Sequence, residues 1–142
     1  MKIVIDTNVL ISGLFFGGYP GQVLRYVCDW FFTSCISIDI LKEYNQTILK
    51  LSEKYQMANN EILKPFLKDS LFVNVKSNLK VCRDSSDDKF INCAIDAKAI
   101  YIVSGDDDLL SLKNVEGIEI ITAKDFCKKI VFIIENTKKI LS

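Results

Sequence analysis

The chain opens with a short apolar stretch that runs into polar side chains, Ile3-Val4-Ile5-Asp6-Thr7-Asn8-Val9-Leu10. The β-branched run from Lys2 to Ile5 predicts a buried strand, and Asp6 stands at its carboxyl end. Ligands of open α/β sheets bind beyond the carboxyl ends of the strands. The stretch therefore predicts a buried strand that places a carboxylate at the edge where ligand sites form.

Strand and helix patterns alternate along the rest of the chain. Further strands are expected at Phe31–Ser37, Leu71–Val75, Ala99–Val103 and Ile118–Ile121. Helices are expected at Gln22–Asp29, Asp39 to about Tyr55, Asp87–Lys98 and from about Ala123 onward. Another should run from Asn59 or Asn60 towards Asp69, where Pro65 could break it. The clearest helix carries an apolar stripe in steps of three and four, formed by Leu41, Tyr44, Ile48, Leu51 and Tyr55.

Turn residues and caps separate these elements. Loops are expected at Gly13–Gly21, which is rich in Gly and contains Pro20, and at the polar stretch Arg83–Asp88. Ser85 or Ser86, and later Thr122, are the expected helix N-caps. The alternation predicts one α/β domain over residues 1–142, a three-layer α/β/α sandwich with a central, mainly parallel, twisted sheet.

Composition narrows the class of protein. The chain has 142 residues, of which 49% are apolar and 25% charged, which is typical of one globular domain. A charge follows three apolar residues at the N-terminus, and no apolar run approaches the roughly 20 residues of a membrane span. We therefore expect a cytoplasmic protein.

Residue usage also excludes several chemistries. The five cysteines are an odd number without a C-x-x-C pair, so we expect free thiols in a reducing compartment. The chain contains no histidine. This absence excludes Ser-His and Cys-His nucleophile pairs and every histidine-ligated metal. Any catalysis should rest on carboxylates, lysine, tyrosine, cysteine or a hard metal ion.

Charge is balanced overall but unevenly distributed. Eighteen basic and 18 acidic residues give zero net charge, which argues mildly against a simple electrostatic nucleic-acid binder. The acids concentrate between residues 84 and 108, and lysines concentrate towards the C-terminus. If a metal ion neutralises several acids, the remaining surface is more basic than the total suggests.

Four acids are expected to meet at one edge of the sheet. Asp6 and Asp106 follow predicted strands, Asp88 begins a predicted helix, and Glu43 lies in the first turns of the long helix. Like charges at close range raise one another's pKa values, so such a cluster normally needs a counter-ion. Oxygen ligands without histidine indicate Mg²⁺ or Mn²⁺, ions that suit phosphodiester hydrolysis. Neutral polar groups that could bond a metal-bound water or a phosphate oxygen stand beside the acids, namely Thr7, Asn8 and Ser104.

Each of these residues also has a purely structural explanation. Asp6 could end a strand and cap a turn, and Glu43 could be a solvated helix residue. Asp87 and Asp88 could favour a helix N-terminus through its dipole. The run Asp106-Asp107-Asp108 could be a hydrophilic loop. Gly17-Gly18 is no phosphate-binding loop, because no Lys-Ser or Lys-Thr follows it.

Taken in order, these segments resemble the motifs of the PIN-domain family. Residues 3–10 resemble its opening motif, an apolar strand followed by Asp-Thr-Asn, and Glu43 in Leu41-Lys42-Glu43-Tyr44 matches its helical acid. Asp88, within Asp87-Asp88-Lys89-Phe90-Ile91-Asn92-Cys93-Ala94, matches the third acid. Val103-Ser104-Gly105-Asp106-Asp107-Asp108-Leu109 resembles the closing motif, with Asp106 as the fourth acid and Asp108 as an auxiliary one. The segment from Arg83 is similar to a subgroup labelled as toxin components of toxin–antitoxin systems, which has proline in place of Ser85.

The resemblance implies a PIN-like sandwich that binds Mg²⁺ or Mn²⁺ and cleaves single-stranded RNA with a metal-activated water. Asp6, Glu43, Asp88 and Asp106 would form the catalytic metal cage, joined by Asp108. Thr7, Asn8 and Ser104 would be supporting polar groups. A toxin of this type would pair with a small antitoxin protein and form a homodimer.

Three other functions have a weaker basis in the sequence. A carboxylate-metal phosphatase with Asp6 as nucleophile would need a second Asp where Asn8 stands. A receiver-like signalling domain would need an Asp at the end of a central strand, and Lys76 follows Val75 instead. A non-catalytic PIN-like binding domain would keep the fold without the activity.

Overall fold

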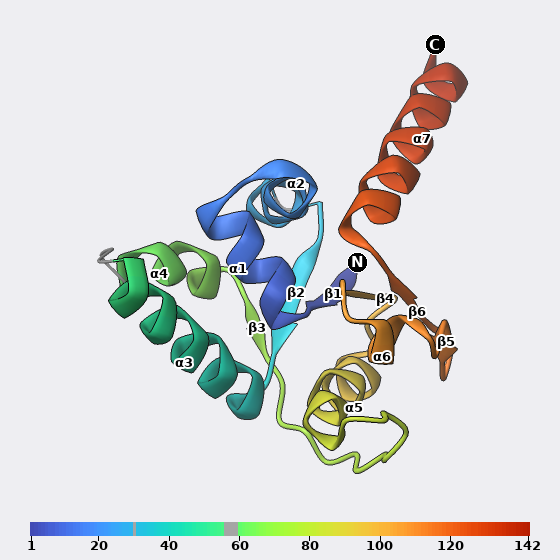
Figure 1. Cartoon of the computed structure of the whole chain (residues 1–142). Coiled ribbons are helices and arrows are strands. Elements are labelled where there is room, and N and C mark those ends of the chain that lie inside the picture. Colours follow the sequence, from blue (N-terminus) through green and yellow to red (C-terminus); the bar gives the residue numbers. More distant parts are fainter. Residues whose placement is uncertain (30, 56–59) are drawn as a thin grey trace.

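The computed structural model describes residues 1–29, 31–55 and 60–142, which form a sheet flanked by helices (Figure 1). The strands are β1 (Lys2–Ile5), β2 (Thr33–Ile36), β3 (Leu71–Phe72), β4 (Tyr101–Val103), β5 (Asn114–Val115) and β6 (Ile118–Ile121). Their order in the sheet is β3-β2-β1-β4-β6-β5. Every neighbouring pair is parallel except β5 with β6. The mainly parallel α/β sheet expected from the sequence is confirmed.

The helices are α1 (Thr7–Phe15), α2 (Gly18–Cys28), α3 (Ile38–Tyr55), α4 (Asn60–Lys68), α5 (Asp88–Ala97), α6 (Asp107–Leu110) and α7 (Ala123–Leu141), with a 3-10 turn, η1 (Ser85–Asp87), before α5. The last half of α7 projects away from the rest of the molecule (Figure 1). Within the part of the chain that the structure describes, no helix is both long and apolar enough to cross a membrane.

The core is built on the central strands. Ile3, Val4 and Ile5 are completely buried, as the β-branched run predicts. The apolar stripe of α3 packs inward through Tyr44, whose hydroxyl donates a hydrogen bond to the carbonyl oxygen of Ile5. This bond fixes α3 at the end of β1, next to Asp6.

The loop expected at Gly13–Gly21 is wrong, because two helices occupy most of it. Helix α1 continues to Phe15, and α2 begins at Gly18. Pro20 is tolerated in the first turn of α2, where backbone N–H groups have no partner within the helix. Gly13 lets the two helices approach, since a Cβ there would lie 2.8 Å from the carbonyl oxygen of Pro20.

Other boundaries shift by a few residues. Strand β3 ends at Phe72 instead of Val75, because the chain beyond it leaves the sheet. Pro65 lies inside α4 without ending it, and the alternative cap at Asn59 lies outside the described residues. The cap expected for α5 at Ser85 or Ser86 is wrong, because both residues lie in η1, which Asp84 caps by accepting the Ser86 backbone N–H at 3.0 Å. The residue before α5 is Asp87, whose side chain makes no capping hydrogen bond. The cap at Thr122 is confirmed.

Candidate active site

The site begins where the two central strands end together. Ile5 and Val103 are partners in the parallel β1–β4 pair, and the backbone N–H of Asp6 donates to the carbonyl oxygen of Val103 at 2.9 Å. This register places Asp6 beside Ser104. The buried Ser104 hydroxyl donates to Asp6 Oδ2 at 2.6 Å and accepts from the Asp106 backbone N–H at 3.0 Å. Ser104 therefore joins the two acids expected at this edge.

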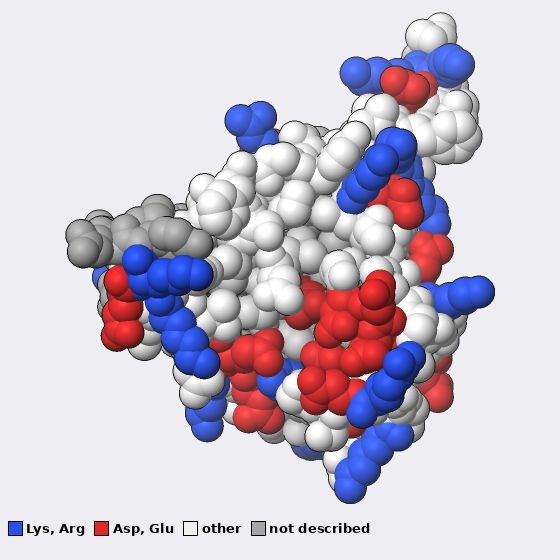
Figure 2. Space-filling model, in the orientation of Figure 1, with Lys and Arg blue, Asp and Glu red and all other residues white. Residues whose placement is uncertain are grey.

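Three carboxylates converge at the same edge. One oxygen each of Asp87, Asp106 and Asp108 lies within 4.8 Å of the other two. Asp106 caps the short α6 and accepts the Asp108 backbone N–H at 2.9 Å, which fixes the Asp106 side chain against the turn that carries Asp108. Figure 2 shows the acidic side chains gathered on one face, over α6 and the start of α5.

Asp87 carries the clearest electrostatic signature in the cluster. Its side chain is buried, and its Oδ2 atom has no hydrogen-bond partner among the described residues. Burial, followed by the neighbouring Asp106 carboxylate, raises the pKa of Asp87 to about 7. A buried carboxylate oxygen among other acids costs free energy unless a proton, as in a hydrogen bond with Asp106, or a cation neutralises the charge.

Asp6 lies beside this cluster and is repelled by the negative charges of its carboxylates. Its residue is 4% exposed, and burial raises the pKa of its carboxyl group. The hydrogen bond from Ser104 offsets part of that effect, while Glu43 and Asp106 add to it through repulsion.

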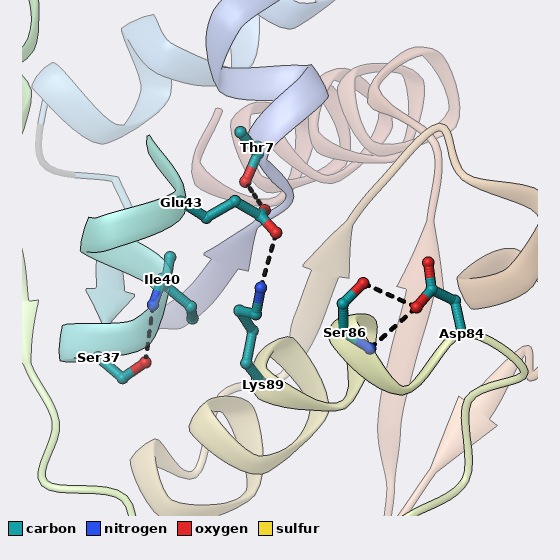
Figure 3. A network of polar contacts seen from close by, with 7 residues as sticks. All are labelled: Thr7, Ser37, Ile40, Glu43, Asp84, Ser86 and Lys89. Atoms are coloured by element: carbon teal, nitrogen blue, oxygen red, sulfur yellow. Dashed lines mark hydrogen bonds and ion pairs between the residues drawn. The ribbon is translucent and has the colours of Figure 1, made fainter. Parts of the chain in front are cut away.

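Glu43 is fixed by two donors from different helices, as Figure 3 shows. The Thr7 hydroxyl of α1 donates to Oε2, and Lys89 Nζ of α5 forms an ion pair with Oε1 at 2.7 Å. Both charged side chains of the pair are mostly buried. Glu43 thus lies next to Asp6 and links α1, α3 and α5 at the edge of the site.

Asp88, expected in the metal site, does not face the cluster. Its neighbour Asp87 lies in the cluster instead. Asp88 Oδ1 accepts the backbone N–H groups of Val81 and Cys82 at 3.1 and 2.9 Å. Burial acts to raise the pKa of Asp88, but these hydrogen bonds outweigh it, so the pKa lies below its ordinary value. Successive residues of a helix point about 100° apart, so neighbours at a helix start face different surroundings.

Asp88 is one member of a ladder of three side chains along α5. Asn92 binds the backbone N–H and carbonyl of Leu79 at 2.7 and 3.0 Å, and Asp96 accepts the backbone N–H groups of Lys76 and Ser77. The spacing of four residues places all three on one helix face. We call the extended segment that they hold, residues 73–82, the strap. The strap sequence shows neither a helix nor a strand pattern, so it gives no sign that α5 holds this segment.

The remaining predicted residues are placed as follows. Asn8 is exposed and lines a neighbouring hollow of about 350 Å³, and Asp107 is exposed on the surface. Asp108 belongs to the cluster and lies 3.4 Å from Arg83, measured between Oδ1 and Nε. The sequence patterns did not predict that Asp87 belongs to the cluster. The Asp-x3-Asn-x3-Asp spacing from Asp88 to Asp96 is the signal that could have assigned Asp88 to another face.

Comparison with known proteins identifies the family. The family model described as PIN domain matches residues 2–108, which include every acid of the site. The chain therefore belongs to the PIN-domain family, whose members are generally nucleases that use divalent metals.

Two individual proteins are similar to this chain. An uncharacterized protein of Methanocaldococcus jannaschii, MJ1680, is 42% identical over 119 residues, which cover 80% of this chain and 76% of that protein. The crystal structure of VapBC2 from Rickettsia felis, bound to a DNA fragment from its promoter, contains a chain with a TM-score of 0.57 at 16% identity. The match covers 84% of this chain and 97% of that one, and it is a likeness of fold.

Proposed function

We propose that this protein is a metal-dependent endoribonuclease that hydrolyses phosphodiester bonds of single-stranded RNA. The observation that supports this most directly is the buried, unpartnered Oδ2 of Asp87 among carboxylate oxygens that lie within 4.8 Å of one another. Phosphodiester hydrolysis needs positive charge and an activated water, and this chain has no histidine to supply either.

The donor set fits Mg²⁺ or Mn²⁺. Both ions prefer oxygen ligands, and two oxygens on opposite sides of one Mg²⁺ are about 4.2 Å apart, twice the metal–oxygen distance. The cluster oxygens lie within 4.8 Å of one another, a spread of the same order as this value. We assign the ion to Asp87, Asp106 and Asp108, with Asp6 beside them. When bound, such an ion lowers the pKa of a water and offsets charge on phosphate oxygens.

The other residues hold this site in shape. The Ser104 hydroxyl bonds both Asp6 and the Asp106 backbone, so it keeps the ends of β1 and β4 in register at the metal ligands. The Thr7 hydroxyl and Lys89 Nζ orient Glu43 towards the same edge. Both carboxylate oxygens of Glu43 are thereby occupied, so Glu43 ties α1, α3 and α5 together at this edge.

We further propose a cytoplasmic role as the toxin of a toxin–antitoxin pair, with a small antitoxin protein as partner and assembly as a homodimer. The fold likeness to a chain of VapBC2, a toxin–antitoxin complex, supports this setting.

Cleavage of RNA tests the enzymatic part of the proposal. A pool of mixed single-stranded RNA is incubated with the wild type, Asp87→Asn and Asp107→Asn, each with Mg²⁺, Mn²⁺ or EDTA. Asp107 is the matched control, because it carries the same charge but is exposed, next to Asp106 and Asp108 in α6. We expect metal-dependent cutting by the wild type and Asp107→Asn, and a loss of at least 100-fold in Asp87→Asn, the order of effect seen when a key electrostatic group is removed.

Two outcomes would contradict the proposal. Cutting that persists in EDTA, or that Asp87→Asn retains in full, would remove the basis for a metal site at this cluster.

A further inference from the structure

Lys89 is a mostly buried cation at the acidic edge of the site. It follows Asp88 in the first turn of α5, and its side chain is 20% exposed. Its Nζ atom lies 2.7 Å from Glu43 Oε1 and 5.8 Å from the ring centre of the buried Phe90. Lysine is rarely so buried without a partner, and an ammonium group over an aromatic ring gains a further attraction. The positive charge of Lys89 is therefore held at one place, beside Glu43.

The start of α5 directs three consecutive side chains to three different surroundings. Asp87 lies in the acidic cluster, and Asp88 accepts backbone N–H groups of the strap. Lys89, the next residue, pairs with Glu43. Because successive residues of a helix point about 100° apart, one turn can place an acid in the cluster and a cation next to it.

The cluster and Glu43 differ in how firmly their negative charge is already paired. Among the described residues, the cluster has one ion pair, from Asp108 to Arg83 at 3.4 Å, and the arginine side chain is 78% exposed. Such exposed pairs contribute little, so a metal ion can take the place of the arginine. Glu43 is different, because its Oε1 is paired with Lys89 and its Oε2 accepts the Thr7 hydroxyl (Figure 3). The cluster is thus open to a metal ion, whereas both oxygens of Glu43 are engaged.

Glu43 needs a positive charge beside it. Its side chain is 28% exposed, and its charge repels that of the buried Asp6. Partly buried carboxylates at close range require a counter-charge. In two-metal phosphodiester sites a second ion, about 3.5–4 Å from the first, supplies such a charge. Here the ammonium group of Lys89 already contacts Glu43, so a second ion would have to displace it.

We propose that Lys89 supplies at Glu43 the positive charge that a second metal ion supplies in a two-metal site, so that each chain binds one Mn²⁺ or Mg²⁺ ion. That ion binds at the cluster, and Lys89 is a positioning residue that keeps Glu43 out of the metal coordination. The inference rests on the proposed metal site, and it adds the number of ions and the residue that determines this number.

Calorimetric titration of Mn²⁺ at neutral pH counts the ions bound by each chain. The proteins are the wild type, Lys89→Gln, Lys42→Gln and a double variant that combines Glu43→Gln with Lys89→Gln. Lys42→Gln is the control, because Lys42 adjoins Glu43 in α3 but is exposed and forms no ion pair among the described residues. The double variant removes both charges of the pair, so that neither is left buried and alone.

We expect one Mn²⁺ per chain in the wild type and in Lys42→Gln. Lys89→Gln should bind two, because Glu43 can then hold an ion beside Asp6. In the double variant the number should return to one, at an affinity within about threefold of the wild type, since the loss of a group that supports a metal ligand costs about tenfold or more. Two ions in the wild type, one ion in Lys89→Gln, or binding at least tenfold weaker in the double variant would overturn the inference.

The same titration separates this inference from the nuclease proposal. Two ions in the wild type together with metal-dependent RNA cleavage would leave the nuclease and remove the role of Lys89. The absence of Mn²⁺ binding in the wild type would remove the metal site itself, and with it both proposals. Thermal unfolding in EDTA checks that each variant is folded. If Lys89→Gln is not, the ion count of the wild type and the affinity of the double variant decide.

Discussion

In the metal-free protein, Asp87 should make the free energy of unfolding rise on mild acidification. Burial and the neighbouring Asp106 raise the pKa of Asp87 from 3.8 to about 7. A carboxyl group with a higher pKa in the folded than in the unfolded chain binds its proton more tightly when folded. The folded state therefore loses stability as the pH rises from the unfolded pKa to the folded one, and regains it on the way down.

The size of the effect follows from the shift. One pKa unit corresponds to about 1.36 kcal/mol, so lowering the pH from 8 through the folded pKa to 5.5 should add about 2 kcal/mol to the free energy of unfolding. Asp6, whose pKa burial also raises, acts in the same direction. Asp84, Asp88 and Asp96 have lowered pKa values, so their stabilising contribution is lost only below the ordinary value of 3.8, outside this range.

Urea unfolding in EDTA, followed by circular dichroism, measures this change. With a slope of roughly 2 kcal/mol per M, the wild type should show a midpoint about 1 M higher at pH 5.5 than at pH 8. Asp107→Asn should behave like the wild type. Asp87→Asn should lose most of the gain and be more stable than the wild type at pH 8, since the neutral amide carries no buried charge. Equal gains in the wild type and Asp87→Asn would refute the assignment of the raised pKa to this residue.

Three further substitutions test the packing around the site, each by urea unfolding. Asp88→Ala should cost about 1–3 kcal/mol, because two strap N–H groups lose their acceptor, whereas Asp88→Asn should cost less; equal costs would contradict the ladder. Ser104→Ala should cost a similar amount, about 1–3 kcal/mol, and weaken Mn²⁺ binding in calorimetry; unchanged binding would show that the hydroxyl does not position the acids. Gly13→Ala should destabilise by about 1–3 kcal/mol through its clash with the Pro20 carbonyl, and a neutral result would mean that α1 and α2 are not closely packed.

The sequence predicts those features that depend on local pattern. The β-branched run before Asp6 and the apolar stripe of α3 identify inward faces directly: Ile3, Val4 and Ile5 are buried, as are Tyr44 and Ile48 of the stripe, while Leu41 and Leu51 are partly buried. The loop expected at Gly13–Gly21 is wrong because helix formation there depends on contacts between two helices and not on local sequence. Gly and Pro usually mark loops, but here Gly13 admits the α2 backbone and Pro20 occupies a helix turn where it costs little. Only the packing of the two helices decides between these outcomes.

In the site, too, some features follow from local pattern and topology, and others depend on long-range packing. Asp6 and Asp106 follow parallel strands, so their meeting at one edge follows from topology, and Ser104 shows the contact. The choice between Asp87 and Asp88 depends on what lies on either side of the start of α5. Asp88 accepts hydrogen bonds from strap backbone N–H groups six and seven residues earlier in the chain. No periodic sequence pattern marks that irregular segment.

The most direct test of the metal site is calorimetric titration of Mn²⁺ into the wild type, Asp87→Asn and Asp88→Asn at neutral pH. The three carboxylates of the cluster include Asp87, whereas Asp88 is turned to the strap. We predict that Asp87→Asn weakens Mn²⁺ binding at least tenfold, the order of effect expected when even a group supporting a metal ligand is lost. Asp88→Asn should stay within about threefold of the wild type, short of that range. Weakened binding in Asp88→Asn together with unchanged binding in Asp87→Asn would contradict the site described above.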